Sequence, residues 1–92
     1  MKELIINKVI INVEMVKKQE IKTSNQGVEF LTFTGAYSIF VGGERMKGKL
    51  KFSAKDGQVK FINRIPEGGN VYIEGYFNQN GLITVTHFQE LE

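Results

Sequence analysis

The chain of 92 residues contains no cysteine and no tryptophan, and it has only one proline and one histidine. Without cysteine, neither a disulfide framework nor a thiolate zinc site can form. His87 has no second histidine or cysteine with which to share a metal ion, and neither a catalytic triad pattern nor a nucleophile elbow accompanies it. We therefore expect no metal, no cofactor and no catalytic residue, and a structural role for His87.

Long hydrophobic runs are also missing from the sequence. No stretch approaches the ~20 apolar residues of a membrane span, and the first fifteen residues lack the unbroken apolar core of a signal peptide. The turns GGE (42–44) and EGG (67–69) have neither the Walker nor the dinucleotide-binding pattern. The sequence thus predicts a cytoplasmic protein that is not an enzyme, with no membrane partner and one domain over residues 1–92.

The net charge of +2 conceals an uneven distribution of charge along the chain. Residues 45–64 carry seven basic side chains against the single acid Asp56, which gives +6, whereas the remainder has five lysines and nine glutamates, which gives −4. Such asymmetry indicates an anionic partner for one surface. The basic residues of this segment are Arg45, Lys47, Lys49, Lys51, Lys55, Lys60 and Arg64.

Alternation of apolar and polar residues with period two predicts β-strands over most of the chain. The expected strands cover 4–16, 28–40, 46–53, 71–78 and 82–91. Gly35 and Ala36 predict a bulge or a sharp bend in the second strand. Turns are expected at TSNQG (23–27), at the glycine pair 42–43 and at NQNG (78–81), the last of the primed hairpin type.

A short helix is expected between the third and fourth strands, because Val59, Ile62 and Ile65 recur at a spacing of three. Ser53 or Asp56 is the expected cap, and PEGGN (66–70) ends the helix. This order of elements is typical of an all-β, five-stranded OB-fold barrel with one short helix between strands 3 and 4. The competing architecture is an SH3-like barrel, which would not need a helix at 54–65.

Three stretches resemble the bacterial single-stranded DNA-binding protein family. NKVIINV (7–13) resembles its first strand, GVEFLTFTGA (27–36) its second and GGNVYIEGYF (68–77) its fourth, in the family's order, and the likeness spans residues 7–91. Two features differ: there is no tryptophan, and the chain stops at Glu92 without the acidic tail that recruits replication enzymes. The chain therefore looks more like the primosomal replication protein N branch, or like a phage or mobile-element single-strand binder.

The resemblance implies binding of single-stranded DNA, for which proteins use a positive groove and aromatic platforms. Lys47, Lys49 and Lys51 supply charge on one face of the third strand, and Arg45 and Lys55 extend it. The alternative is a solvated face whose lysines discourage pairing at a sheet edge. The candidate stacking residues are Phe40, Tyr37, Tyr72 and Tyr76, and the last two fit a subunit interface or plain surface better.

Phe52 alternates with the lysines and falls on the side of Leu50, so we assign it to the core, although the family often has a base-contacting aromatic residue near that position. Phe33, Phe61 and Phe88 are assigned to the core as well. Phe30 fits either the core or the surface.

These features lead us to expect non-enzymatic binding of single-stranded DNA with little sequence preference, in replication, recombination or repair. A second hypothesis is an OB-fold protein-interaction or primosome-type assembly subunit, and a third is RNA binding, because stacking and phosphate contacts alone do not separate RNA from DNA. The resemblance and the long first strand also imply a homodimer or homotetramer. Replication proteins are further candidate partners, although the recruitment tail is missing.

Overall fold

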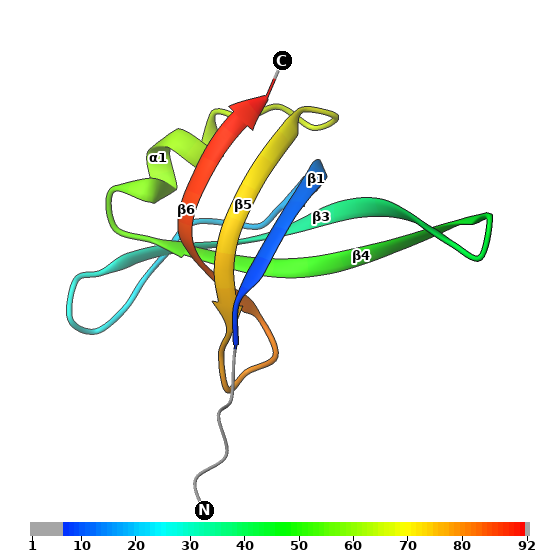
Figure 1. Ribbon diagram of the computed structural model, residues 1–92. Coiled ribbons are helices and arrows are strands. Elements are labelled where there is room, and N and C mark those ends of the chain that lie inside the picture. Colours follow the sequence, from blue (N-terminus) through cyan, green and yellow to red (C-terminus); the bar gives the residue numbers. More distant parts are fainter. Residues whose placement is uncertain (1–6, 92) are drawn as a thin grey trace, which may run out of the picture.

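A closed ring of strands forms the body of the computed structural model, which describes residues 7–91 (Figure 1). The elements are β1 (Val9–Lys18), β2 (Lys22–Thr23), β3 (Glu29–Val41), β4 (Glu44–Lys55), α1 (Gln58–Asn63), β5 (Asn70–Phe77) and β6 (Ile83–Leu91). The strand order is β1-β5-β6-β4-β3-β2, and an additional pairing of β1 with β3 closes the ring. The predicted OB-fold arrangement is confirmed, with the helix between β4 and β5.

The core lies inside this ring and is built by the alternating inward residues of each strand. Phe33 and Phe52 stack at its centre, with ring centroids 5.1 Å apart and an interplanar angle of 16°. Phe52 is completely buried, so its assignment to the core is confirmed. The buried hydrophobic residues are Val13, Met15, Leu31, Phe33, Phe52, Ala54, Val59, Ile62, Ile65, Val71, Ile73, Ile83 and Val85.

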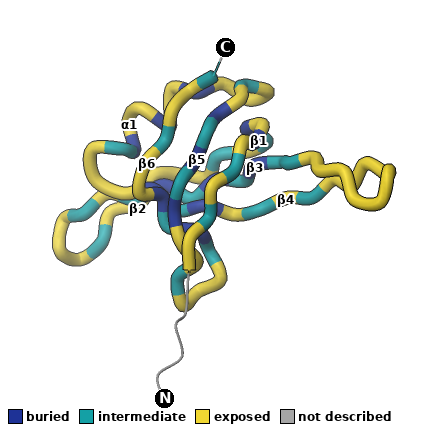
Figure 2. Tube along the Cα trace, viewed as in Figure 1, coloured by how far each residue is buried: buried dark blue, intermediate teal, exposed yellow. Residues whose placement is uncertain are grey.

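The β3–β4 hairpin is longer than the ring that it helps to close. Its ladder runs without interruption from the pair Phe30–Lys55 to the pair Val41–Glu44, whereas β1 pairs with β3 only as far as Ala36. The part of the hairpin over residues 37–48, which we call the arm, therefore projects from the ring (Figure 1). Its far end is exposed on both faces, including the apolar side chains of Ile39, Val41 and Met46 (Figure 2).

The tip of the arm is a tight turn at Gly42 and Gly43, as predicted. Their φ angles of 58° and 84° are both positive, which is the requirement of a type I′ hairpin turn and which glycine meets without steric cost. The turn at 78–81 differs from its prediction, because only Gly81 has a positive φ there. Instead, the Asn78 side-chain carbonyl accepts hydrogen bonds from the backbone N–H groups of Asn80 and Leu82.

The predicted bulge at Gly35 and Ala36 is wrong, because the irregularity lies in the partner strand. The register of β1 against β3 shifts between Met15 and Lys17, directly beside Gly35. A Cβ atom at Gly35 would come within 2.6 Å of Val13 Cγ2. Gly35 is therefore needed for the close approach of β1 and β3, and β3 itself pairs with β4 through Gly35 and Ala36 without a register shift.

The strand boundaries also differ in detail from the prediction. The first strand begins at Val9 and ends at Lys18, and the predicted residues 4–6 lie outside the described residues. The two-residue strand β2 was not predicted, because a segment this short has no period to detect. It pairs with β3 opposite Glu29 and Phe30.

Helix α1 forms as predicted, but its caps differ. Gly57 is the N-cap residue and no side chain caps the helix, so the predicted cap by Ser53 or Asp56 is wrong. Asp56 instead has a φ of 56° and accepts the Val59 N–H with its backbone carbonyl. In the part of the chain that the structure describes, no helix has the length and apolarity to cross a membrane.

Phe61 points away from the core, contrary to its assignment. In a helix, successive residues are separated by about 100°, so residue 61 lies roughly 200° around the axis from Val59. Val59 and Ile62 fill the face of α1 that packs on the core, and the Phe61 side chain is left 51% exposed. Phe88 is half-buried and packs against the core.

The C-terminal end of α1 is held by a lysine of β1. Lys18 Nζ donates hydrogen bonds of 2.6 Å to the backbone carbonyls of Asn63 and Ile65. These carbonyls lie at the end of the helix, where they lack intrahelical donors.

We predict that Lys18→Met, which keeps an apolar stem, lowers the free energy of unfolding by about 1–2 kcal/mol in urea denaturation. Lys17→Met, at an exposed neighbour, is the matched control and should change it by less than about 0.5 kcal/mol. Equal effects of the two substitutions would contradict this role of Lys18.

Candidate nucleic-acid interface

The outer face of the β3–β4 hairpin carries a line of positive charge. Because side chains alternate along a strand, every second residue of β4 points outward, opposite to the buried Phe52. Five of these residues are basic and exposed, and we call them the basic row: Arg45, Lys47, Lys49, Lys51 and Lys55. The row extends over roughly 33 Å at about 3.3 Å per residue.

Neutral side chains of β3 lie directly across from the lysines in the middle of the row. The cross-strand pairs are Lys51 with Thr34, Lys49 with Ala36 and Lys47 with Ser38. Side chains directly opposite each other on one face of an antiparallel pair are the nearest neighbours between the strands. No carboxylate therefore occupies the cross-strand position of these three lysines, and the short partners leave their charge open to solvent.

Aromatic residues of β3 occupy the cross-strand positions at both ends of the basic row. At the arm, Phe40 lies opposite Arg45, whose guanidinium carbon is 5.3 Å from the ring centroid. The Phe40 side chain is 70% exposed. At the other end, the half-buried Phe30 lies opposite Lys55. The sequence does not decide between the core and the surface for Phe30. Its position opposite a basic residue follows from the β3–β4 register.

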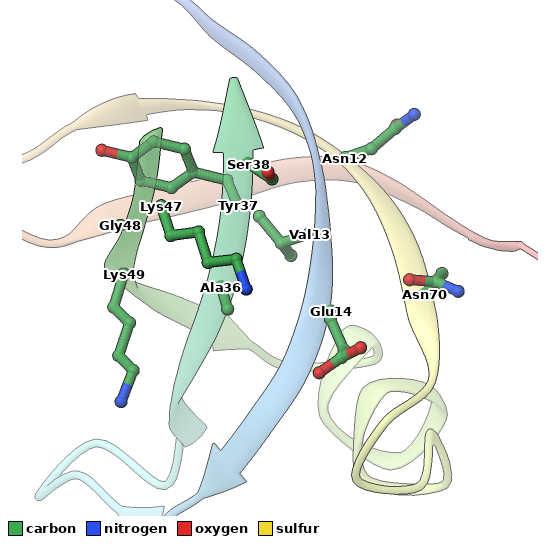
Figure 3. Close-up of a pocket in the computed structure, with 10 residues that line it drawn as sticks. All are labelled: Asn12, Val13, Glu14, Ala36, Tyr37, Ser38, Lys47, Gly48, Lys49 and Asn70. Atoms are coloured by element: carbon green, nitrogen blue, oxygen red, sulfur yellow. The ribbon is translucent and has the colours of Figure 1, made fainter. Parts of the chain in front are cut away.

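A cavity of about 610 Å³ opens where β1 and the arm diverge (Figure 3). Lys47 and Lys49 border it from β4, and Glu14 and Asn70 border it from β1 and β5. Its lining residues are Asn12, Val13, Glu14, Ala36, Tyr37, Ser38, Lys47, Gly48, Lys49 and Asn70. The cavity brings three predicted site residues together, because Tyr37 lines it as well.

Tyr37 belongs to the inward face of the hairpin, opposite to the basic row. It pairs with Gly48 across the ladder, and a Cβ atom at Gly48 would collide with the tyrosine ring. The ring therefore packs over the glycine, an arrangement that holds an aromatic side chain flat against a hairpin. Tyr37 lines the cavity but does not share a surface with Phe40.

Tyr76 lies near the other end of the basic row. A shallow hollow of about 400 Å³ is lined by Phe30 of β3, Ser53 and Lys55 of β4 and Tyr76 of β5. These strands meet there because β4 joins β6 at the pairs Phe52–Ile83 and Ser53–Thr84, and Tyr76 lies opposite Thr84. Two aromatic rings and one lysine thus share this hollow.

Tyr72 lies elsewhere, in an acidic environment. It pairs with Gln89, at the end of β6 distant from the β4 junction. Its hydroxyl donates a hydrogen bond of 2.7 Å to Glu74 Oε2, and its ring meets that of His87 edge to face with centroids 6.3 Å apart. The hydrogen bond to Glu74, followed by partial desolvation and the charge of the same carboxylate, raises the pKa of Tyr72 above its usual value.

The structure therefore groups most of the predicted site residues and separates two. Phe40 and the basic row form one continuous surface, Tyr76 borders its end, and Tyr37 lies behind it. Tyr72 is not part of this surface. A role for any of these residues in binding stays a prediction.

No family model matches the chain, and no curated protein matches its sequence. In structure, it is similar to the protein PriB of Ralstonia solanacearum, with a TM-score of 0.86 and 12% identity over 96% of this chain and 100% of that chain. It is also similar to the SSB domain of a Synechococcus protein, with a TM-score of 0.77 and 13% identity over 96% and 99% of the two chains. A complex of Plasmodium falciparum SSB with ssDNA gives a TM-score of 0.77 and 18% identity over 100% of both chains.

These likenesses show the fold. The chain has the OB-fold architecture that SSB domains and PriB share. The resemblance of the sequence to single-stranded DNA-binding proteins and their primosomal branch is thereby confirmed at the level of the fold.

The environment of Tyr72 gives a prediction about its titration. Replacing Glu74 by alanine removes the carboxylate that accepts the phenol hydrogen bond, so the pKa of Tyr72 should fall toward its ordinary value. The ultraviolet absorbance of tyrosinate in a pH titration measures this change, and Tyr72→Phe identifies which transition belongs to Tyr72. Glu90→Ala, which removes an exposed carboxylate of β6, is the control and should leave the titration unchanged. An identical titration of the Glu74→Ala protein and the unmodified protein would contradict the hydrogen bond.

Proposed function

We propose that this chain binds single-stranded DNA along the outer face of the β3–β4 hairpin, without catalysis and with little sequence preference. The observation that supports it is the basic row with aromatic residues at both of its ends. Evenly spaced cations on one face fit the phosphates of an extended strand, and exposed rings fit its unpaired bases. The complex of Plasmodium falciparum SSB with ssDNA, in the same fold, gives this proposal further support.

The proposed roles follow from the position of each residue. Arg45, Lys47, Lys49 and Lys51 contact phosphates, and Phe40 stacks a base beside Arg45. At the other end, Lys55 contacts a phosphate and Tyr76 offers its ring. Phosphates and the faces of bases are common to every sequence, so these contacts carry little sequence information.

The exposed edge of β1 supports self-association of the chain. Residues Val9–Glu14 pair with β5 on one side, and pairing with β3 on the other side begins only at Glu14. Within residues 7–91, the second edge of Val9–Val13 therefore has no partner strand. An unpaired edge is a template for another strand, and we propose that a second copy of the chain pairs there to give a homodimer or a higher homo-oligomer.

The binding proposal is tested by titrating a labelled oligothymidine, its RNA counterpart and a duplex of equal length. We expect the strongest binding to the DNA single strand, with a slope of log affinity against log salt near −3.5 if the five basic residues of the row each neutralise about one phosphate. Binding of the RNA strand alone would favour the RNA hypothesis. Binding of none of the three would favour the hypothesis of an assembly subunit.

A variant assigns this binding to the basic row. Replacing Lys47, Lys49 and Lys51 together by glutamine should weaken binding to all single-stranded sequences alike and reduce the magnitude of the salt slope by about 2, since each phosphate contact contributes about 0.7. The pair Lys8→Gln and Lys17→Gln, at exposed lysines outside the row, is the control for loss of charge alone. If the control weakens binding as much per charge as the row variant, the row has no special role.

Self-association is tested by light scattering and hydrogen exchange. We expect a particle mass of at least twice the 10.4 kDa of one chain at micromolar concentration. Amides on the free edge of Val9–Val13 should be protected from exchange at high protein concentration and lose that protection on dilution, because their hydrogen-bond partners belong to the second copy. A monomer mass at micromolar concentration would contradict the proposed pairing.

A further inference from the structure

Helix α1 presents an exposed aromatic ring between two cations. Phe61 lies on the face of the helix opposite to the buried Val59 and Ile62. Lys60 Nζ is 5.9 Å and Arg64 Cζ is 5.8 Å from the centroid of its ring, both within the range of a cation–π interaction. The structure already has such a pair at the arm, where Arg45 lies over Phe40.

A hollow of about 650 Å³ lies beside this ring, between α1 and β6. Phe61 and the half-buried Phe88 supply two aromatic rings to its wall, and Val85 adds apolar surface. Lys55, the last residue of the basic row, also lines it. The full lining is Lys55, Asp56, Gly57, Gln58, Phe61, Val85 and Phe88.

Lys55 connects this hollow to the basic row. The same residue lines the hollow that holds Phe30 and Tyr76 and the hollow that holds Phe61. Figure 1 shows α1 and the tip of the arm at opposite ends of β4. Lys55 and Asp56 are the charged residues that line the hollow itself. Beyond the end of β4, Lys60 and Arg64 supply further positive charge beside the Phe61 ring.

We propose that the hollow beside Phe61 is a further subsite for the nucleic-acid strand that the basic row binds. Phe61 stacks one base of that strand, and Lys60 and Arg64 contact the adjoining phosphates. The inference rests on the proposed function, since it extends the same path past the ring onto the helix. Its consequence is that a strand long enough to reach α1 binds more tightly than one that covers only the hairpin.

Two features favour a nucleic acid over an acidic peptide as the occupant. The first is continuity, because Lys55 belongs to the basic row and to the hollow alike. The second is repetition, because an exposed phenylalanine beside basic side chains occurs at the arm end of the row and again on α1. An acidic peptide with an aromatic anchor would match the charge of this hollow, but it would not account for the matching pair at Phe40.

A tryptophan at position 61 tests the subsite directly. The chain has no tryptophan, so Phe61→Trp introduces a single fluorophore at a half-exposed position. We expect an oligothymidine of about 20 nucleotides to quench its fluorescence through base stacking, and one of about 8 nucleotides to quench it much less. The control is His87→Trp, whose exposed position on β6 lies beside Tyr72 and outside both the basic row and the hollow, and its fluorescence should not change.

Removal of the ring tests the energetic consequence. Phe61→Ala should weaken binding of the longer oligonucleotide by about tenfold and that of the shorter one by less than about twofold. Its melting temperature should match that of the unmodified chain, because the ring is not part of the core. An unchanged affinity for both lengths, or equal losses for both, would overturn the subsite while leaving the proposed function intact.

Two further outcomes separate the proposals from each other. If the unmodified chain binds no oligonucleotide of either length, the proposed function fails and this inference fails with it. If a labelled acidic peptide with a terminal phenylalanine binds the chain and loses binding in Phe61→Ala, while the longer oligonucleotide binds both proteins equally, the hollow is a protein-docking site and the inference is overturned.

Discussion

Phe33 and Phe52 are opposite each other in the β3–β4 ladder, stacked and almost completely buried, and this pair fixes the register of the hairpin. Because strand side chains alternate with a period of two, a slip of one residue would turn every side chain of β4 to the other face. Lys49 and Lys51 would then face the core side, where unpaired charges are strongly unfavourable. The chemistry of the outer face thus depends on two rings inside the core.

The second constraint is that the β3–β4 hairpin is longer than the ring, so its outer part projects as the arm. Pairing of β1 with β3 ends at Ala36, so the arm has the core at its base and solvent at its tip. A two-stranded ribbon is only marginally stable alone, and continuity with the core-packed half of the hairpin supports this one. Ile39 lies on the same face of β3 as the buried Leu31 and Phe33, and Met46 lies opposite Ile39 on β4. Both are exposed because the hairpin extends past the ring, so no core lies beneath this face of the arm.

Most of the fold could be predicted from the local periodicity of the sequence, because each strand or helix shows its own pattern of apolar residues. The succession of strands along the chain and the burial of Phe52 could be predicted from alternation, and the short helix from apolar residues at a spacing of three. The bulge in β1 could not, since Gly35 marks a close approach between strands and does not say which strand adjusts. Phe61 was assigned to the core by residue type, although the spacing of Val59 and Ile62 already placed it on the other face of α1.

The same distinction applies to the candidate site: residues on one strand could be grouped from the sequence, and residues brought together from different strands could not. The basic row was visible in the sequence, because it lies on one strand. The grouping of Phe30, Tyr76 and Lys55 was not, since it requires the junction of β4 with β6 and the pairing of β5 with β6. Tyr72 has the same residue type as Tyr76 and lies on the same strand, yet its neighbour Glu74 gives it an acidic environment.

Lysines on β4 would also serve to protect an exposed strand edge, and the structure allows that role. β4 pairs with β6 only at Phe52 and Ser53, so in the described part of the chain its other edge has no partner strand from Glu44 to Lys51. The two roles require the same charges, and the lysines alone cannot distinguish them. The aromatic residues can, because an edge is protected by charge, proline or a bulge and gains nothing from an exposed ring. Phe40, 70% exposed beside Arg45, therefore favours binding as the reason for the row.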